Sequence, residues 1–227
     1  DLRMSRGLGD VYKRQMFDPS ILVNYFVLGT QDTNGERHFF EVLEEALQSK
    51  ISVFQYREKG QLALSGSEKL RVAKKVRQLT ADYHVPLIID DDIQLAHEID
   101  AEGVHFGQKD GDIINNIQLA ENLAVGVSVS NDSQYKRIEN IKGIDYIGIG
   151  PVFATVSKAD ANPEIGVEGL KYLTSRSKWP SVAIGGISEI NLSSVLSTGV
   201  NGAAVISMIS QSANISATLK YWRSLHL

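Results

Sequence analysis

The chain has 227 residues, of which 43% are hydrophobic and 22% are charged, a composition that suits one large globular domain or two small ones. A formal net charge of −4 argues against nucleic acid as a partner, and the absence of cysteine excludes disulfide scaffolds, cysteine-ligated metals and thiol catalysis. Because no apolar run approaches the roughly 20 residues of a membrane span, we expect no membrane partner and a cytoplasmic location.

The first fifteen residues have no apolar periodicity and resemble translated cloning sequence. We therefore expect residues 1–15 to be a non-native extension that does not pack against the fold. On this interpretation Met16 is the natural first residue, and residues 16–227 form one domain.

Eight short apolar runs follow, and each is succeeded by an amphipathic stretch. A strand, a loop and a crossover helix fit within each repeat. The runs are nearly continuous in apolar residues, which is typical of parallel strands that helices cover. They are Tyr25–Thr30, Ile51–Glu58, Pro86–Asp91, Gly103–Gly107, Ala124–Val129, Tyr146–Val152, Ser181–Ile187 and Gly202–Ile209.

The stretches between the runs have helical spacing. Apolar side chains share one face in Glu36–Ser49 and again in Ser67–Tyr83. Acidic residues begin Asp132–Ile141 and Glu189–Ser197, where they favour a helix N-terminus. Gly199 stands where a glycine commonly ends a helix.

Eight such units in one chain predict a single (β/α)8 barrel, an α/β fold. The alternative is a doubly wound open sheet, whose dinucleotide-binding signature G-x-G-x-x-G should follow the first strand. Thr30-Gln31-Asp32 stands there instead, and Gly148 and Gly150 do not complete the motif elsewhere. The sequence therefore favours the barrel.

Polar residues gather where the predicted strands end, which is where barrels place their active sites. Asp91 and Asp110 follow neighbouring strands and can share a hard cation such as Mg²⁺. Arg57, Lys59 and Lys158 can neutralise phosphate oxygens. This combination favours a metal-bound diphosphate as ligand or leaving group.

A second phosphate site is indicated at the Gly185-Gly186 turn and after the eighth run, where barrels often hold a monophosphate on backbone N–H groups. Two phosphorylated substrates follow from this pattern. Each feature also has a simpler interpretation by itself: Arg57-Glu58-Lys59 as solvated charges, Asp90-Asp91-Asp92 as helix caps, and the glycine pair as a tight turn. We expect His105, inside the fourth run, to be a hydrogen-bonded core residue rather than a base.

The chain carries six sequence blocks in a fixed order: Gln55–Lys59, Pro86–Asp91, Gly103–Asp110, Asp145–Phe153, Thr155–Lys158 and Ala183–Ile187. These blocks resemble the thiamine-phosphate synthase family over nearly all of residues 20–212. The resemblance implies a transferase of thiamine biosynthesis that joins hydroxymethylpyrimidine diphosphate to a thiazole phosphate. The implied mechanism is dissociative: diphosphate leaves, the aminopyrimidine ring stabilises a methylene cation, and the thiazole nitrogen attacks.

The same resemblance implies roles for individual residues. Mg²⁺ is the implied cofactor, held by Asp91 and Asp110. The implied catalytic residues are Arg57, Lys59, Ser128 and Lys158, which with Gln55 hold the pyrimidine diphosphate. The implied contacts of the thiazole phosphate are Thr155, Ser157, Gly186, Ile206 and Ser207. Tyr56, Glu58, Asp90 and Val156 complete the expected substrate-binding set.

One departure from the family touches the chemistry, because Asp90 stands where the family usually has asparagine. An ionised carboxylate cannot donate a hydrogen bond. Asp90 therefore either takes up a proton and donates as asparagine would, joins the metal ligands, or caps the next helix. Since side chains alternate along a strand, we expect Asp90 and Asp91 to diverge unless the strand has already ended.

Two rival functions remain open. A TenI-type thiazole tautomerase has the same fold but relies on a histidine shortly after the serine of the fifth strand, and no histidine stands between Ser128 and Asp132. A non-catalytic, ligand-sensing barrel would lack the metal carboxylates, which this chain retains. The sequence leaves the oligomeric state open, a homo-oligomer included.

Overall fold

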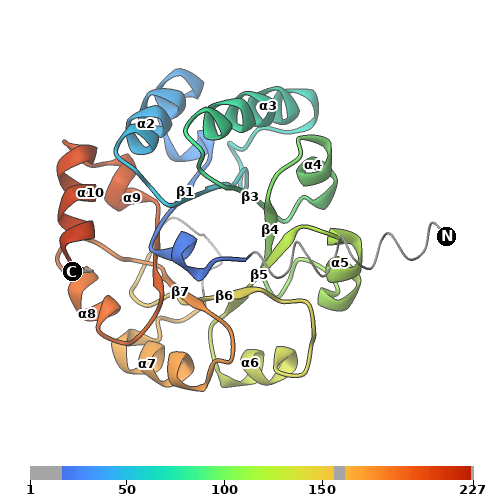
Figure 1. The fold of residues 1–227 in the computed structure, drawn as a ribbon, viewed down its shortest axis with the longest axis vertical. Coiled ribbons are helices and arrows are strands. Elements are labelled where there is room, and N and C mark those ends of the chain that lie inside the picture. Colours follow the sequence, from blue (N-terminus) through green and yellow to red (C-terminus); the bar gives the residue numbers. More distant parts are fainter. Residues whose placement is uncertain (1–16, 156–161, 226–227) are drawn as a thin grey trace.

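A computed structural model describes residues 17–155 and 162–225. Eight parallel strands pair in chain order and close into a barrel (Figure 1). This confirms the (β/α)8 prediction, and the open sheet is wrong. The expectation for residues 1–15 falls outside the described residues. The strands are β1 Asn24–Leu28, β2 Val53–Tyr56, β3 Leu87–Asp90, β4 Gly103–Phe106, β5 Ala124–Val129, β6 Tyr146–Ile149, β7 Ser181–Ile184 and β8 Gly202–Val205.

Most strands are shorter than the apolar runs that predicted them. The run Ile51–Glu58, for example, contributes only Val53–Tyr56 to the sheet. The predicted run Gly202–Ile209 is wrong at its end, because Ser207–Ser210 forms a short helix, α9, rather than continuing β8. Apolar composition alone does not mark where the pairing stops, since the loops above a barrel also bury apolar side chains.

Helices surround the barrel, and each of the four that the sequence predicted is present with shifted ends (Figure 1). In the described ranges no helix is long and apolar enough to span a membrane. The helices are α2 Glu36–Gln48, α3 Gly66–Asp82, α4 Ile93–Glu98, α5 Ile113–Ala120, α6 Asp132–Ile138, α7 Gly166–Arg176, α8 Leu192–Leu196, α9 Ser207–Ser210 and α10 Ile215–Ser224, with the 3-10 turns η1 Pro19–Leu22 and η2 Thr30–Asp32.

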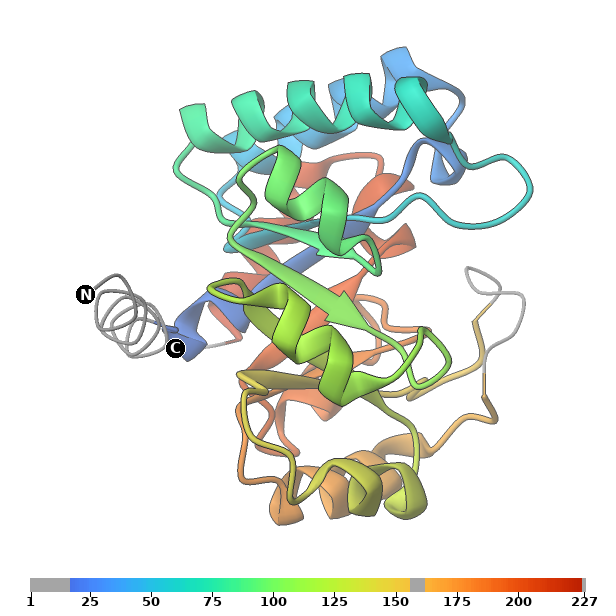
Figure 2. The ribbon, with the colours of Figure 1, turned by 90° about the vertical axis from the view of Figure 1, so that its right-hand side faces the viewer.

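Apolar side chains fill two regions. The larger one lies between the strands and the surrounding helices. The smaller one fills the inside of the barrel with Leu22, Tyr25, Val27, Val53, Ile88, Tyr146, Val182 and Ala204. The turn η1 packs against β1 and β8 at the amino-terminal end of the strands, and the strand arrowheads point away from it (Figure 2). The opposite, carboxyl end is therefore the open one.

Candidate active site at the carboxyl ends of the strands

A cavity of about 330 Å³ lies inside the open end of the barrel. Every strand contributes to its wall, as a barrel active site requires. One contributor from each strand, in chain order, is Tyr25, Gln55, Asp90, His105, Ser128, Gly148, Ile184 and Ala204.

Most of the residues predicted from the sequence meet in this cavity. Those that line it are Gln55, Arg57, Lys59, Asp90, Asp110, Ser128, Thr155, Gly186, Ile206 and Ser207. Val156, Ser157 and Lys158 lie outside the described residues.

Of the predicted residues that the structure describes, Tyr56, Glu58 and Asp91 do not line the cavity. Along and just beyond β2, Gln55, Arg57 and Lys59 face inward, so the residues between them face outward. Tyr56 packs on Phe39 with ring centroids 6.0 Å apart.

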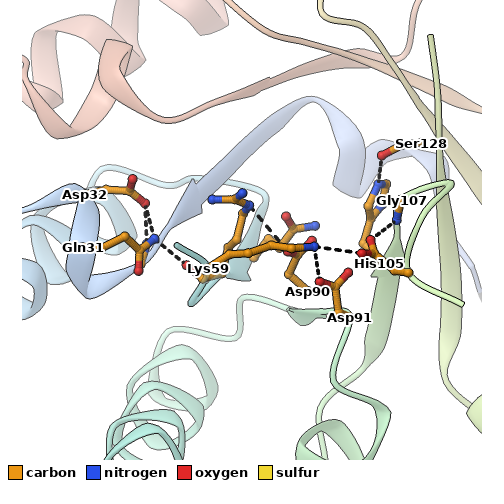
Figure 3. A network of polar contacts seen from close by, with 12 residues as sticks. Gln31, Asp32, Lys59, Asp90, Asp91, His105, Gly107 and Ser128 are labelled. Carbon is orange, nitrogen blue, oxygen red and sulfur yellow. Dashed lines mark hydrogen bonds and ion pairs between the residues drawn. The ribbon is translucent and has the colours of Figure 1, made fainter. Parts of the chain in front are cut away.

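The two predicted metal carboxylates share a lysine, and Figure 3 shows Asp91 beside Lys59. Lys59 Nζ donates to Asp110 Oδ1 at 2.9 Å and also to Asp91 Oδ2. The backbone N–H of Gly107 donates to the other oxygen of Asp110 at 2.7 Å. Asp91 Oδ1 is buried and has no hydrogen-bond partner among residues 17–155 and 162–225. One acceptor of this pair is thus left for a further positive group.

The two carboxylates differ in acidity. Burial and the neighbouring negative charge of Asp90 raise the pKa of Asp91. Burial also opposes ionisation of Asp110, but the hydrogen bonds that it accepts from Lys59 and the Gly107 amide help to outweigh it, and the pKa of Asp110 is lowered. Burial would lower the pKa of Lys59, yet its hydrogen bonds to both aspartates raise it, so the lysine is cationic.

The run of three aspartates divides between two environments. The strand β3 ends at Asp90, and Asp91 has a positive φ of 63°, so the expected alternation stops here. Asp90 lines the cavity, and Asp91 binds Lys59, which lines it as well. Asp90 Oδ2 lies 3.5 Å from Arg57 Nε. Asp92 instead caps α4 by accepting from the Leu95 amide at 3.0 Å. The capping role considered for Asp90 is therefore wrong.

Glu58 connects two loops at the rim. Its carboxylate accepts the backbone N–H of Thr30 at 2.8 Å, the Thr30 hydroxyl at 3.1 Å and the backbone N–H of Leu64 at 2.8 Å. Beside it, the Gln31 side-chain amide donates to Arg57 O at 2.8 Å and to Asp32 Oδ2 at 2.9 Å (Figure 3). The backbone between Arg57 and Lys59 is consequently held from both sides.

A chain of hydrogen bonds crosses the floor of the cavity. Gln55 Nε2 lies 2.8 Å from the Tyr25 hydroxyl, which lies 2.8 Å from the Tyr146 hydroxyl. The Tyr146 hydroxyl lies 3.1 Å from His105 Nδ1, and His105 Nε2 lies 2.9 Å from Ser128 Oγ. His105 is thus a hydrogen-bonded, buried residue as expected, but it also lines the cavity. The sequence did not predict a polar role for Tyr25 or Tyr146, because each stands in an apolar run and is expected to pack in the core.

The opposite wall is formed by the loops after β7 and β8. Gly185 and Gly186 both have positive φ, 98° and 65°. Asn191 holds this turn by donating from Nδ2 to Gly186 O at 3.0 Å. Ser207 begins α9 next to it. Both segments line the same cavity, so the two regions that the sequence proposed for phosphates face one space.

Several polar wall residues carried no signal in the sequence analysis. They come from the loop after β4, from the segment around α6, and from the loop before α7, and they are Gln108, Lys109, Ser130, Gln134, Arg137 and Asn162. Asn162 Nδ2 donates to Ser130 Oγ at 2.9 Å. Gln108 and Lys109 belong to the block Gly103–Asp110, and their place after the fourth predicted strand was the one feature of the sequence that pointed to the cavity.

Comparison with known proteins extends over nearly the whole barrel. A family model described as thiamine monophosphate synthase matches residues 24–209. A thiamine-phosphate synthase of Leuconostoc citreum is 59% identical over 209 residues, which is 92% of this chain and 99% of that protein. One from Staphylococcus epidermidis is 42% identical over 208 residues, covering 91% of this chain and 98% of that protein.

Solved structures are similar to this chain as well. The thiamine phosphate pyrophosphorylase of Pyrococcus furiosus superposes with a TM-score of 0.80 at 34% identity, covering 91% of this chain and 96% of that one. A 3-hexulose-6-phosphate synthase, at 16% identity and a TM-score of 0.64, shares the fold alone. From the matched family model and these full-length relatives, we conclude that the chain belongs to the thiamine monophosphate synthase family.

Proposed function

We propose that the cavity joins a pyrimidine diphosphate to a thiazole phosphate, so that the chain acts as a Mg²⁺-dependent thiamine-phosphate synthase. The chain is then a transferase. The observation that carries this proposal is that Arg57, Lys59 and Asp110 line one cavity and that Lys59 also binds Asp91. Cationic side chains and carboxylates together suit a metal-bound diphosphate, for which either set alone would be incomplete.

In the proposed reaction the bond between the pyrimidine methylene carbon and the diphosphate oxygen breaks. The electron pair leaves with the diphosphate, and the aminopyrimidine ring stabilises the cation that remains. The thiazole nitrogen then forms the new carbon–nitrogen bond. Arg57, Lys59, Ser128 and Lys158 are the proposed contacts of the leaving group. This chemistry needs charge stabilisation and positioning rather than a strong base.

The residues present fit Mg²⁺. When bound, the ion would neutralise charge on the departing diphosphate. Asp91 and Asp110 would hold it, and Asp91 Oδ1 is a buried acceptor without a hydrogen-bond partner in the part of the chain that the structure describes. In the described residues no three acidic or histidine side chains form a metal cage. Two carboxylates with substrate oxygens and water are nonetheless a usual set for this ion.

Lys59 occupies the position between the two carboxylates. A cation held by both would displace the ammonium group, which can then turn toward the diphosphate. The proposal thus gives Lys59 two partners at different stages: the aspartates in the free protein and the diphosphate in the complex.

Removal of divalent ions tests the metal requirement. We expect EDTA to abolish turnover and an excess of Mg²⁺ to restore it, because the carboxylate pair alone repels a diphosphate. The measurement is thiamine phosphate formation by mass spectrometry. A protein that keeps its full rate in EDTA would contradict the Mg²⁺ proposal.

The thiazole phosphate is proposed to bind on the opposite wall. Gly186, Ile206 and Ser207 line the cavity there, where barrels commonly hold a phosphate on backbone N–H groups. Thr155 lies on the same wall, and Ser157 follows it in sequence. Two substrates on facing walls would place the attacking nitrogen across from the leaving group.

Glu58 is proposed to position Arg57 and Lys59 rather than to touch substrate. Glu58→Gln replaces one acceptor oxygen with an amide that cannot accept from Thr30 or Leu64. We expect the free energy of unfolding to fall by about 1–3 kcal/mol and KM for the pyrimidine diphosphate to rise roughly tenfold, because the loop that carries both cations loosens. Thermal unfolding and steady-state kinetics measure the two effects.

Glu68→Gln provides the matched control. Glu68 lies on the exposed face of α3 and pairs with Arg71 at 3.0 Å, away from the cavity, so its removal should leave KM unchanged. Equal KM values for the two variants would show that Glu58 does not position the cations.

Product analysis decides between the proposed synthase and its rivals. Purified protein with both substrates and Mg²⁺ should form thiamine phosphate and diphosphate in equal amounts. Isomerisation of the thiazole without coupling would instead indicate a tautomerase, and binding without turnover would indicate a ligand-sensing barrel.

A further inference from the structure

Five polar side chains form one continuous hydrogen-bonded chain across the barrel, from Gln55 through Tyr25, Tyr146 and His105 to Ser128. Its inner members are buried: Tyr146 is 0% exposed, Tyr25 1% and His105 9%. Buried hydroxyls with so few partners have few orientations available, because an unpaired buried donor is costly. The orientation of one hydrogen bond therefore constrains the next.

The direction of the chain follows from its ends. Gln55 Nε2 can only donate, so the Tyr25 hydroxyl accepts from it and sends its own proton to Tyr146. Tyr146 has then accepted one hydrogen bond and donates its proton to His105 Nδ1. A neutral imidazole whose Nδ1 accepts carries its proton on Nε2. That N–H faces Ser128 Oγ at 2.9 Å.

We propose that Tyr146 is a positioning residue that fixes the Nε2–H tautomer of His105 and thereby leaves the Ser128 hydroxyl proton free to be donated to an anion in the cavity. Ser128 lines the cavity, whereas Tyr146 is not among the described residues that line it and bonds to two that do, His105 and Tyr25. In the opposite tautomer, with the proton on Nδ1, Ser128 would donate its hydroxyl proton to His105 Nε2. It would then have only lone pairs to offer a diphosphate.

The tyrosines are suited to this task. Burial raises the pKa of Tyr25 and holds the pKa of Tyr146 well above its usual range, so both hydroxyls keep their protons at neutral pH. The hydroxyls consequently pass on a fixed orientation rather than a charge. Ser128 is held independently by Gln108, whose Nε2 donates to Ser128 O at 2.9 Å.

Tyr146→Phe and Tyr25→Phe form a matched pair for the test. Each removes one buried hydroxyl from the same chain, but only Tyr146 contacts His105. Nitrogen-15 NMR of labelled histidine distinguishes a protonated from an unprotonated ring nitrogen, and His105→Asn identifies the His105 signals among the five histidines. We expect Nε2–H with unprotonated Nδ1 in the wild type. Tyr25→Phe should keep this tautomer, because His105 Nδ1 remains as an acceptor for the buried Tyr146 proton, whereas Tyr146→Phe should give a population with protonated Nδ1.

A kinetic cycle tests whether Tyr146 acts through Ser128. Tyr146→Phe should lower kcat/KM about tenfold, the scale of one hydrogen bond to a charged group. In a Ser128→Ala background the same change should have less than a twofold effect, because the hydroxyl it orients is gone. Thermal unfolding confirms that each variant is folded.

Three results would overturn the inference: protonated Nδ1 in the wild type, an unchanged His105 tautomer in Tyr146→Phe, or fully additive kinetic losses. The inference rests on the proposed function only for the nature of the anion. If the wild type forms no thiamine phosphate, the proposed function fails, whereas the tautomer is measured on the free protein and stands or falls separately.

Discussion

Replacing Asp91 or Asp110 with alanine should lower kcat/KM about 100-fold or more, roughly 3 kcal/mol of transition-state stabilisation. The two carboxylates are the proposed metal ligands, and Lys59 is bonded to both. Their loss removes the clamp on the departing diphosphate and leaves Lys59 with one partner. Steady-state kinetics at saturating Mg²⁺ measure the change. The Mg²⁺ concentration for half-maximal activity should also rise.

Asp92→Ala is the control from the same run of aspartates. Asp92 accepts from Leu95 N at 3.0 Å and from Lys69 Nζ at 2.8 Å, outside the cavity. Loss of this helix cap should decrease the free energy of unfolding by about 1 kcal/mol and leave kcat/KM within about twofold. Similar kinetic losses in all three variants would indicate damage to the fold of this loop rather than loss of a metal site.

Gly186→Ala should raise KM for the thiazole phosphate about 10- to 100-fold while changing KM for the pyrimidine diphosphate much less. A Cβ at Gly186 would lie 2.5 Å from Ala154 O and 2.7 Å from Phe153 Cβ. Its φ of 65° adds strain for any other residue, on the order of 1–3 kcal/mol. The loop after β6 must then shift against the proposed phosphate site. Kinetics with each substrate varied in turn separate the two effects.

Gly166→Ala separates the strain from the contact. Gly166 has the same φ of 65°, but a Cβ there would have nothing within 4 Å. It should therefore lose stability without a selective change in either KM. If Gly186→Ala instead raised KM for the pyrimidine diphosphate to the same extent, the proposal of two phosphates on facing walls would be wrong.

The sequence by itself was enough to predict the barrel and the group of residues at its mouth. Eight apolar runs separated by amphipathic stretches favour parallel strands with crossover helices, and the carboxyl ends of such strands converge. Arg57, Lys59 and Asp110 could therefore be placed in one cavity from their positions alone, and the structure confirms that they line it.

Only the tertiary structure decided where each strand stops and hence which neighbours face inward. Glu58 lies between two residues that line the cavity but turns away to bind Thr30 and Leu64. Asp90 lines the cavity and Asp91 binds Lys59 of its wall, because β3 ends at Asp90 and Asp91 adopts a positive φ. If a strand ends one residue earlier or later, a side chain can face outward instead of toward the cavity. The composition of the sequence does not show at which residue a strand ends.

The hydrogen-bonded chain on the cavity floor could not be predicted from the sequence, for a different reason. Tyr25 and Tyr146 are 121 positions apart, and each stands in an apolar run where it is expected to pack rather than to bond. Barrel closure brings their hydroxyls together, with His105 beside them. Local patterns record which residues face the interior, whereas only the packed interior determines which polar atoms meet, because those contacts join strands that are distant along the chain.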